Sequence, residues 1–211
     1  SDATIRDCTI EGNIAQQDGG GLRCDGASPV ISNCTITGNT AMDSGGGIRC
    51  KDDSLPVIVS CIVSGNEAVT NGGGIYLTGD SDARIENSTL FGNISGDHGG
   101  AIYSKDSNPF IAACGISNNV AVDGGGIAFR DATNAVVSNC LVLANTAYED
   151  GGGLRFKIAV GRVYDTFIAG NTAHTDGGGM ECCYTSMVLV ESCTFADNTA
   201  FAAQRMAFKD G

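Results

Sequence analysis

The chain has 211 residues, among them 31 glycines and ten cysteines, and its formal net charge at pH 7 is −12. An acidic chain is repelled by phosphate backbones, which argues against nucleic acid as a general partner. The sequence contains no run of 18 apolar residues, so we expect no transmembrane helix. No signal peptide is visible, which fits a mature secreted chain as well as a cytosolic one.

A repeat of 26 or 27 residues runs through the whole sequence. A unit of this size has too little apolar surface to fold alone, whereas stacked units bury a continuous core. A glycine-rich phrase such as Gly45-Gly46-Gly47-Ile48 marks each of the first seven units. The repeat therefore predicts one solenoid domain over residues 1–211. One asparagine anchors each of the eight units: Asn13, Asn39, Asn66, Asn93, Asn119, Asn145, Asn171 and Asn198.

Each unit is predicted to contain short strands, because its apolar residues alternate with period two and never recur at helical spacing over three turns. The first strand carries an aliphatic residue eight positions before the anchor, from Ile5 to Val190. Two positions later most units have Asn, Asp or Ser, which suit a sharp bend between strands. The second strand carries its inward residue three positions before the anchor, from Ile10 to Phe195.

The third strand follows the glycine run and carries its aliphatic residue nine positions after the anchor, from Leu22 to Met180. Glycine permits the tight turn that precedes this strand. Three unbroken aliphatic ladders predict an all-β fold, a right-handed single-stranded parallel β-helix of about eight rungs with three strands per rung. We expect the anchor asparagines to form a structural ladder, in which each side-chain amide bonds to the next rung.

The glycine phrase is paired throughout with a strand phrase that ends in asparagine, as in residues 99–102 and 34–39. This pairing resembles the repeat of the chlamydial polymorphic outer membrane proteins, and it is similar to other right-handed β-helix repeats on bacterial surfaces. The resemblance covers essentially the whole chain. It implies export, surface display and adhesion, although a fold alone does not determine function.

Nine of the ten cysteines fall at positions predicted to face inward, and Cys183 is predicted to point outward. Stacked neighbours such as Cys24 and Cys50 would have Cα atoms within disulfide range, but parallel stacking keeps their Cβ atoms further apart than a relaxed bridge needs. We therefore expect buried free thiols that pack as small hydrophobes. A one-dimensional ladder supplies no converging ligands, so no metal site and no cofactor are predicted.

Basic and tyrosine side chains gather on the predicted outward face of the third strand. On an acidic protein such a stripe is suited to an anionic glycan or an acidic partner surface. Pairing with the neighbouring acidic corner is the alternative interpretation. The stripe consists of Arg23, Arg49, Lys51, Tyr76, Tyr103, Lys105, Arg130, Arg155 and Lys157.

The predicted outward face of the second strand carries an apolar group over the middle and later rungs. A soluble monomer rarely displays such a contiguous patch. We therefore predict self-association, in which this group is buried against another copy of the chain. The group consists of Ile62, Phe91, Leu141, Leu143 and Phe167.

The eighth unit lacks the glycine run, and neither end carries an amphipathic capping helix. Solenoids need polar caps. Two interpretations follow: the chain is a fragment of a longer β-helix, or its ends stack on other copies.

The favoured function is a secreted or cell-surface structural or adhesive module that assembles with itself into a filament or surface layer. The alternative is a polysaccharide-binding or polysaccharide-cleaving protein of the lyase or hydrolase type. Repetition argues against an enzyme, because an active site is usually a local departure from the repeat, and no catalytic residue is assigned. The corner carboxylates, such as Asp18, Asp123 and Asp131, suit turns, with weak Ca²⁺ binding as a lesser prediction.

Overall fold

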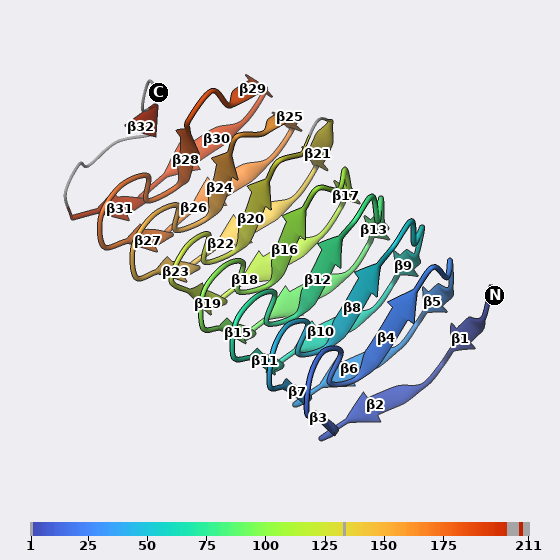
Figure 1. Ribbon diagram of the computed structural model, residues 1–211. Helices are drawn as coiled ribbons and strands as arrows, with labels where there is room; N and C mark the ends of the chain where they lie inside the picture. Colours follow the sequence, from blue (N-terminus) through green and yellow to red (C-terminus); the bar gives the residue numbers. More distant parts are fainter. Residues whose placement is uncertain (1, 133, 202–206, 209–211) are drawn as a thin grey trace.

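The computed structural model describes residues 2–132, 134–201 and 207–208, which form a rod of stacked turns (Figure 1). Strands pair in parallel with their equivalents one turn away, as β4 does with β8 and β1 with β5. The described residues contain strands, turns and bends but no helix. Consequently none of them forms a helix that is long and apolar enough to cross a membrane.

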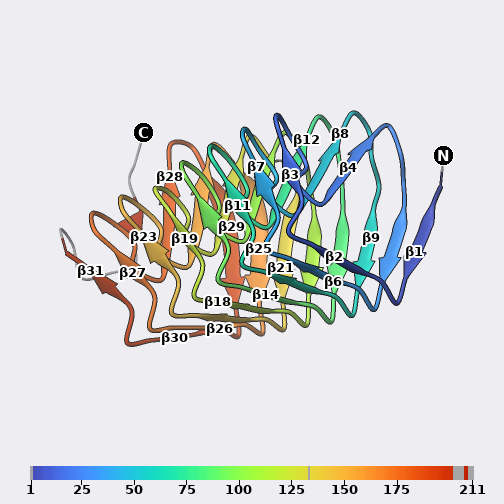
Figure 2. The same cartoon turned by 90° about the horizontal axis from the view of Figure 1, so that it is seen from below.

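Four sheets of eight strands each form the walls of the rod (Figure 2). Sheet A contains β1 (Thr4–Arg6), β5 (Val30–Ser32), β9 (Val57–Val59), β13 (Arg84–Glu86), β17 (Phe110–Ala112), β21 (Ala135–Ser138), β25 (Val160–Tyr164) and β29 (Met187–Glu191). Sheet B contains β2 (Thr9–Glu11), β6 (Thr35–Thr37), β10 (Ile62–Ser64), β14 (Thr89–Phe91), β18 (Gly115–Ser117), β22 (Leu141–Leu143), β26 (Phe167–Ala169) and β30 (Thr194–Ala196).

The other two sheets follow the anchor asparagine and the glycine run, respectively. Sheet C contains β3 (Ile14–Ala15), β7 (Thr40–Ala41), β11 (Glu67–Ala68), β15 (Ile94–Ser95), β19 (Val120–Ala121), β23 (Thr146–Ala147), β27 (Thr172–Ala173) and β31 (Thr199–Ala200). Sheet D contains β4 (Leu22–Asp25), β8 (Ile48–Lys51), β12 (Ile75–Thr78), β16 (Ile102–Lys105), β20 (Ile127–Arg130), β24 (Leu154–Lys157), β28 (Met180–Cys183) and β32 (Ala207–Phe208).

The parallel β-helix of about eight turns is confirmed, but three strands per rung is wrong, because each turn has about four. The additional wall is sheet C, whose strands are two residues long. Two residues are too few to show period-two alternation. The inward residue of these strands is also small, as at Ala41 and Ala121, so it forms no aliphatic ladder that the sequence pattern reveals.

The predicted aliphatic ladders fill the interior of the rod. Ile31, Ile36 and Ile48, one from each ladder, are fully buried. Aromatic side chains continue the core in later turns, where the rings of Phe129 and Phe156 stack with centroids 4.6 Å apart. Burying one such side chain contributes about 1.5–3 kcal/mol to folding. The core therefore extends along the whole rod and depends on stacking.

The predicted bend between the first two strands of each unit adopts the left-handed backbone conformation, which Asn and Asp tolerate better than most residues. Asn33 and Asn87, for example, have φ angles of 53° and 49°. Positive φ occurs in every residue of the column: Asp7, Asn33, Ser60, Asn87, Ala113, Asn139, Asp165 and Ser192.

The anchor asparagines lie between sheets B and C, and their side chains pack against the glycine runs that lead into sheet D. A Cβ atom on Gly73 would lie 2.4 Å from the carbonyl oxygen of Ile94, so only glycine fits there. Asn39 Nδ2 donates to Asn66 Oδ1 at 3.0 Å and to the carbonyl oxygen of Ile10 at 2.9 Å. The same bonds recur from rung to rung, so the buried amides have partners and hold successive turns in register.

Candidate functional site

The outward side of sheet D carries the predicted basic and tyrosine stripe, but neighbouring side chains cover most of it. Arg49, Tyr103 and Arg155 are buried, with 7%, 3% and 6% of their surface exposed. Among the nine residues only Arg23 is exposed. The half-buried members are Lys51, Tyr76, Lys105, Arg130 and Lys157.

Most cations of the stripe lie against a carboxylate of the same or a neighbouring turn. Arg49 lies 3.3 Å from Asp18 and 3.1 Å from Asp25. Lys157 instead lies over the ring of Tyr184. This arrangement favours charge pairing over glycan binding for the stripe. The other pairs are Arg23–Asp25, Lys51–Asp52, Lys105–Asp106 and Arg130–Asp131.

Arg155 is the centre of the most buried charge cluster on sheet D. Its Nε donates to Glu181 at 2.7 Å, its Nη2 donates to Asp150 at 3.1 Å, and its Nη1 pairs with Asp123. Burial alone would lower the pKa of Arg155, but the charges of Asp123 and Glu181 outweigh burial and raise it. The guanidinium therefore stays charged and holds carboxylates from three turns together.

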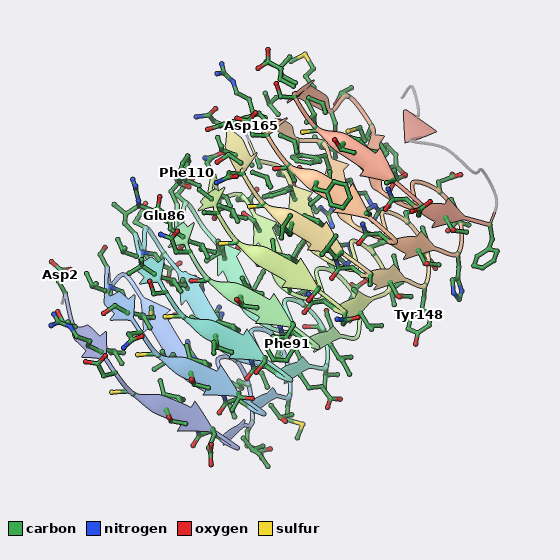
Figure 3. The ribbon with its side chains drawn as sticks, turned by 180° about the vertical axis from the view of Figure 1, so that it is seen from behind. Asp2, Glu86, Phe91, Phe110, Tyr148 and Asp165 are labelled. Atoms are coloured by element: carbon green, nitrogen blue, oxygen red, sulfur yellow. The ribbon has the colours of Figure 1, made fainter. Side chains whose placement is uncertain are left out.

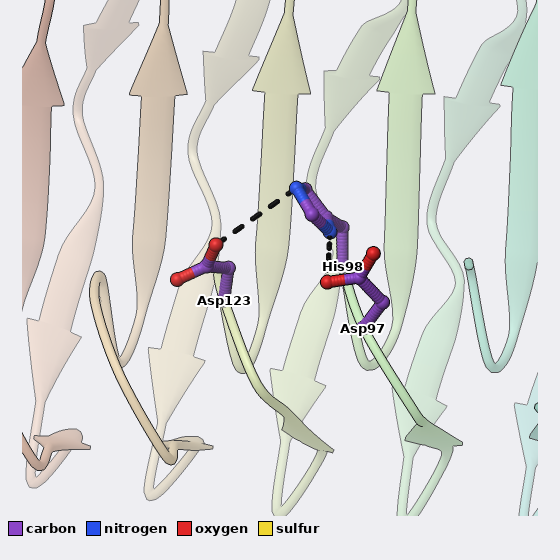
Figure 4. Close-up of side chains that lie close together, drawn as sticks. All are labelled: Asp97, His98 and Asp123. Carbon is purple, nitrogen blue, oxygen red and sulfur yellow. Dashed lines mark ion pairs between the residues drawn. The ribbon is translucent and has the colours of Figure 1, made fainter. Parts of the chain in front are cut away.

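A histidine, His98, lies beside Asp97 and beside Asp123, a member of this cluster (Figure 4). His98 Nδ1 lies 2.6 Å from Asp97 Oδ1, and Nε2 lies 3.8 Å from Asp123 Oδ2. The short contact to Asp97 lacks hydrogen-bond geometry, so Nδ1 is a buried nitrogen without a hydrogen-bond partner. Burial lowers the pKa of His98, although the charges of Asp97 and Asp123 act in the opposite direction.

These three residues are the group of potential metal ligands found within the described part of the chain, and one ligand atom from each lies within 4.8 Å of the others. The sequence pattern predicted no metal site, because the stacked cysteine ladder supplies no converging ligands. The sequence feature that could have revealed this group is the Asp97-His98 pair followed by a carboxylate, Asp123, at the equivalent position of the next repeat. An isolated parallel bridge between His98 and Asp123 places the two residues on adjacent turns.

Two tyrosines extend the cluster along sheet D. The rings of Tyr76 and Tyr103 are stacked with centroids 5.5 Å apart, and the ring of His98 lies 5.1 Å from that of Tyr103. Burial raises the pKa of Tyr103 to about 12. Tyr103 is therefore a neutral phenol at physiological pH, packed into the wall rather than presented to a ligand.

Sheet B presents the opposite kind of surface (Figure 3, where Phe91 is labelled). Four of the five predicted apolar residues are exposed: Ile62 by 44%, Phe91 by 42%, Leu141 by 51% and Phe167 by 40%. Leu143 is half-buried. The structure thus brings these residues together on one face, as the sequence pattern indicated.

Few charges interrupt this face. Its eight strands have three residues each, and among these described residues Glu11 is the only charged one. Gly115 separates Thr89 from Leu141 in the outward column. The missing side chain contributes to a shallow hollow whose lining includes Gly115, Cys140, Leu141, Asp165 and Phe167.

The corner carboxylates between sheets D and A occupy turn positions. Asp80, Asp106 and Asp131 have φ angles of 56°, 50° and 55°. Such left-handed positions favour Asp over most other residues, which accounts for the column without a bound ion. Ca²⁺ binding at these corners stays a prediction.

All ten cysteines are free. Most are buried in the core, and Cys183, which was predicted to point outward, is buried as well. Burial raises the pKa of Cys182 to about 12 and that of Cys183 to about 11. These two side chains are therefore protonated thiols at neutral pH, consistent with packing rather than reactivity.

Comparison with known proteins adds one result. A family model described as a right handed beta helix region matches residues 1–98 and 46–206, which together cover most of the chain. The chain matches no curated protein and no solved structure. The match supports the fold and its hand, whereas the resemblance to the polymorphic outer membrane protein repeat has no match of its own.

Proposed function

Because the chain belongs to the right-handed β-helix family, we propose that it is a structural or adhesive module of the cell surface or extracellular space. In this proposal it associates laterally with a second copy through sheet B. The observation that carries the proposal is the exposed, almost uncharged face of that sheet. The extracellular location rests on the resemblance of the repeat to those of surface proteins.

Charge favours a second copy as the partner on this face. Two chains with a net charge of −12 each repel one another over most of their surfaces. Repulsion is smallest where neither surface carries charge, and sheet B offers such a surface along nearly the whole rod. Burial of Ile62, Phe91, Leu141 and Phe167 then supplies the attraction.

The order of large and small side chains on sheet B is compatible with a symmetric dimer. A two-fold axis makes both copies use the same patch. If this axis runs parallel to the strands and lies between β14 and β18, the two rods are antiparallel. Phe91 of each copy then lies over Ser117 of the other, and Leu143 lies over Ser64. In this column large side chains meet small ones, whereas in the other outward column Ile62 of each copy meets Leu141 of the other, so that both apolar side chains are buried.

The test is sedimentation velocity over a range of protein concentrations. The wild-type chain is expected to associate, and Leu141→Arg is expected to shift it to monomers. Leu55→Arg is the matched control, because Leu55 is 54% exposed but lies outside sheet B. Circular dichroism checks that each variant is folded.

A wild-type chain that stays monomeric at every concentration would refute the proposal. Equal dissociation of the Leu141→Arg and Leu55→Arg variants would also refute it, since association would then not depend on sheet B. Polysaccharide binding has less support, because the cations predicted to bind a glycan are mostly paired within the chain.

A further inference from the structure

One column of the repeat carries an imidazole at a single turn. The position before each glycine run holds a carboxylate in four turns, serine or asparagine in two, and an imidazole only at His98. The column reads Asp18, Ser44, Asn71, His98, Asp123, Asp150 and Asp176. A departure from an otherwise repeated position marks a place where function can be added to the scaffold.

We propose that Asp97, His98 and Asp123 form a binding site for a divalent transition-metal ion of the zinc class. The ligand atoms come from adjacent turns, and one atom from each residue lies within 4.8 Å of the others. Zinc bonds to imidazole nitrogen and carboxylate oxygen are about 2.0–2.2 Å long, so modest side-chain rotations bring the three ligand atoms around one ion.

The second observation is the state of the imidazole. Nδ1 of His98 is buried without a hydrogen-bond partner, yet it lies 2.6 Å from a carboxylate oxygen of Asp97. The nitrogen is therefore a buried polar atom that no group among the described residues satisfies. A cation bound by both atoms would supply that partner.

Exposure and donor type limit which ion fits. The Asp97 side chain is 52% exposed, whereas those of His98 and Asp123 are 14% and 9% exposed. The site is therefore open to solvent on one side, where water can complete the coordination shell. A nitrogen ligand disfavours Ca²⁺ and Mg²⁺, which take oxygen ligands.

Arg155 is the competitor for Asp123, because its guanidinium pairs with that carboxylate. The guanidinium also bonds to Asp150 and Glu181, so it keeps two partners when Asp123 turns towards a metal ion. The positive charge nearby weakens the affinity for the metal. We therefore expect a site that binds one Zn²⁺ and releases it readily to a chelator.

The experiment is calorimetric titration of the full chain with Zn²⁺. One equivalent is expected to bind, and His98→Asn and Asp97→Asn are each expected to weaken binding at least about tenfold, since even outer-shell losses cost about 10–100-fold. Asparagine is the residue of the preceding turn in the same column, Asn71, so the His98→Asn variant is expected to fold. His174→Asn, at the other histidine, is the matched control.

Imidazole ¹⁵N chemical shifts provide a second readout, because the chain has only two histidines. Zinc is expected to shift the His98 nitrogens and to leave those of His174 unchanged. Unaltered binding in the His98→Asn variant would assign the ion to thiols and overturn the proposal. Absence of binding to the wild-type chain, or a shift confined to His174, would overturn it as well.

Discussion

Sheets B and D share one backbone pattern but carry opposite chemistries. In both, parallel strands stack in register, so each side chain lies beside its counterpart one turn away. Sheet D places Arg155 directly beside Glu181, and its cations find carboxylates within the chain. Sheet B stacks uncharged and apolar side chains and leaves several of them exposed. The charged side chains of sheet D therefore pair within the chain. Several apolar side chains of sheet B have no such partner in the described part of the chain and stay exposed.

The strongest test of this difference is the replacement Arg155→Met. It removes a buried guanidinium from Asp123 and Asp150, and breaking such a pair costs about 3–5 kcal/mol of unfolding free energy. Urea unfolding measures the loss. Arg23→Met is the matched variant, because its exposed pair with Asp25 contributes at most about 1 kcal/mol. Equal losses in the two variants would show that burial of the sheet D cluster has no special role.

A smaller effect is expected from Tyr103 at alkaline pH. Burial raises its pKa to about 12, whereas an unfolded tyrosine titrates near about 10. Since the folded-state pKa is the higher one, this contribution to stability is complete below about pH 10 and is lost as the pH rises through about 12. Two pKa units correspond to roughly 2.7 kcal/mol.

The Tyr103→Phe variant should therefore lose less stability than the wild-type chain between about pH 9 and pH 12, by roughly 2–3 kcal/mol. Urea unfolding at the two pH values measures the difference. Tyr184 is 53% exposed, and Tyr184→Phe should keep the full alkaline loss. If Tyr103→Phe and Tyr184→Phe lose equal stability at alkaline pH, the side chains of sheet D do not exclude water from Tyr103, contrary to the structure.

The smallest effect concerns the salt dependence of association through sheet B. Raising the ionic strength from about 0.05 to 0.5 M screens the repulsion between two acidic copies, because the Debye length shortens. Association through an uncharged face should then strengthen a few-fold, as measured by sedimentation equilibrium. Weaker association at high salt would instead indicate an interface built from ion pairs, such as those of sheet D.

The aliphatic core could be predicted because every turn repeats it. Ile31, Ile58 and Ile85 occupy one column, and such a column identifies an inward position without knowledge of the rest of the fold. The sequence pattern did not predict sheet C, because a two-residue strand such as Thr40–Ala41 is too short to show an alternation of apolar and polar residues. The course of such a short strand is determined by its hydrogen bonds to the neighbouring turns, and a sequence pattern does not contain that information.

For the candidate sites, the sequence pattern predicted on which face of a sheet each side chain lies, but not how deeply it is buried. Arg49 and Arg155 stand in the outward column of sheet D, yet carboxylates from neighbouring turns pair with them and both are buried. The cluster around His98 depends on side-chain rotations that bring residues of two turns together. Spacing along the sequence places such residues on adjacent turns, but it does not determine which atoms meet.

The asparagine ladder also gives the rod a direction. In each of its seven links, the amide nitrogen donates to the oxygen of the next asparagine towards the C-terminus. The amide dipoles are thus aligned head to tail along the rod, and each bond polarises the next. A break at Asn93 or Asn119 would therefore weaken bonds in turns that it does not touch, so successive turns are coupled electrically as well as by packing.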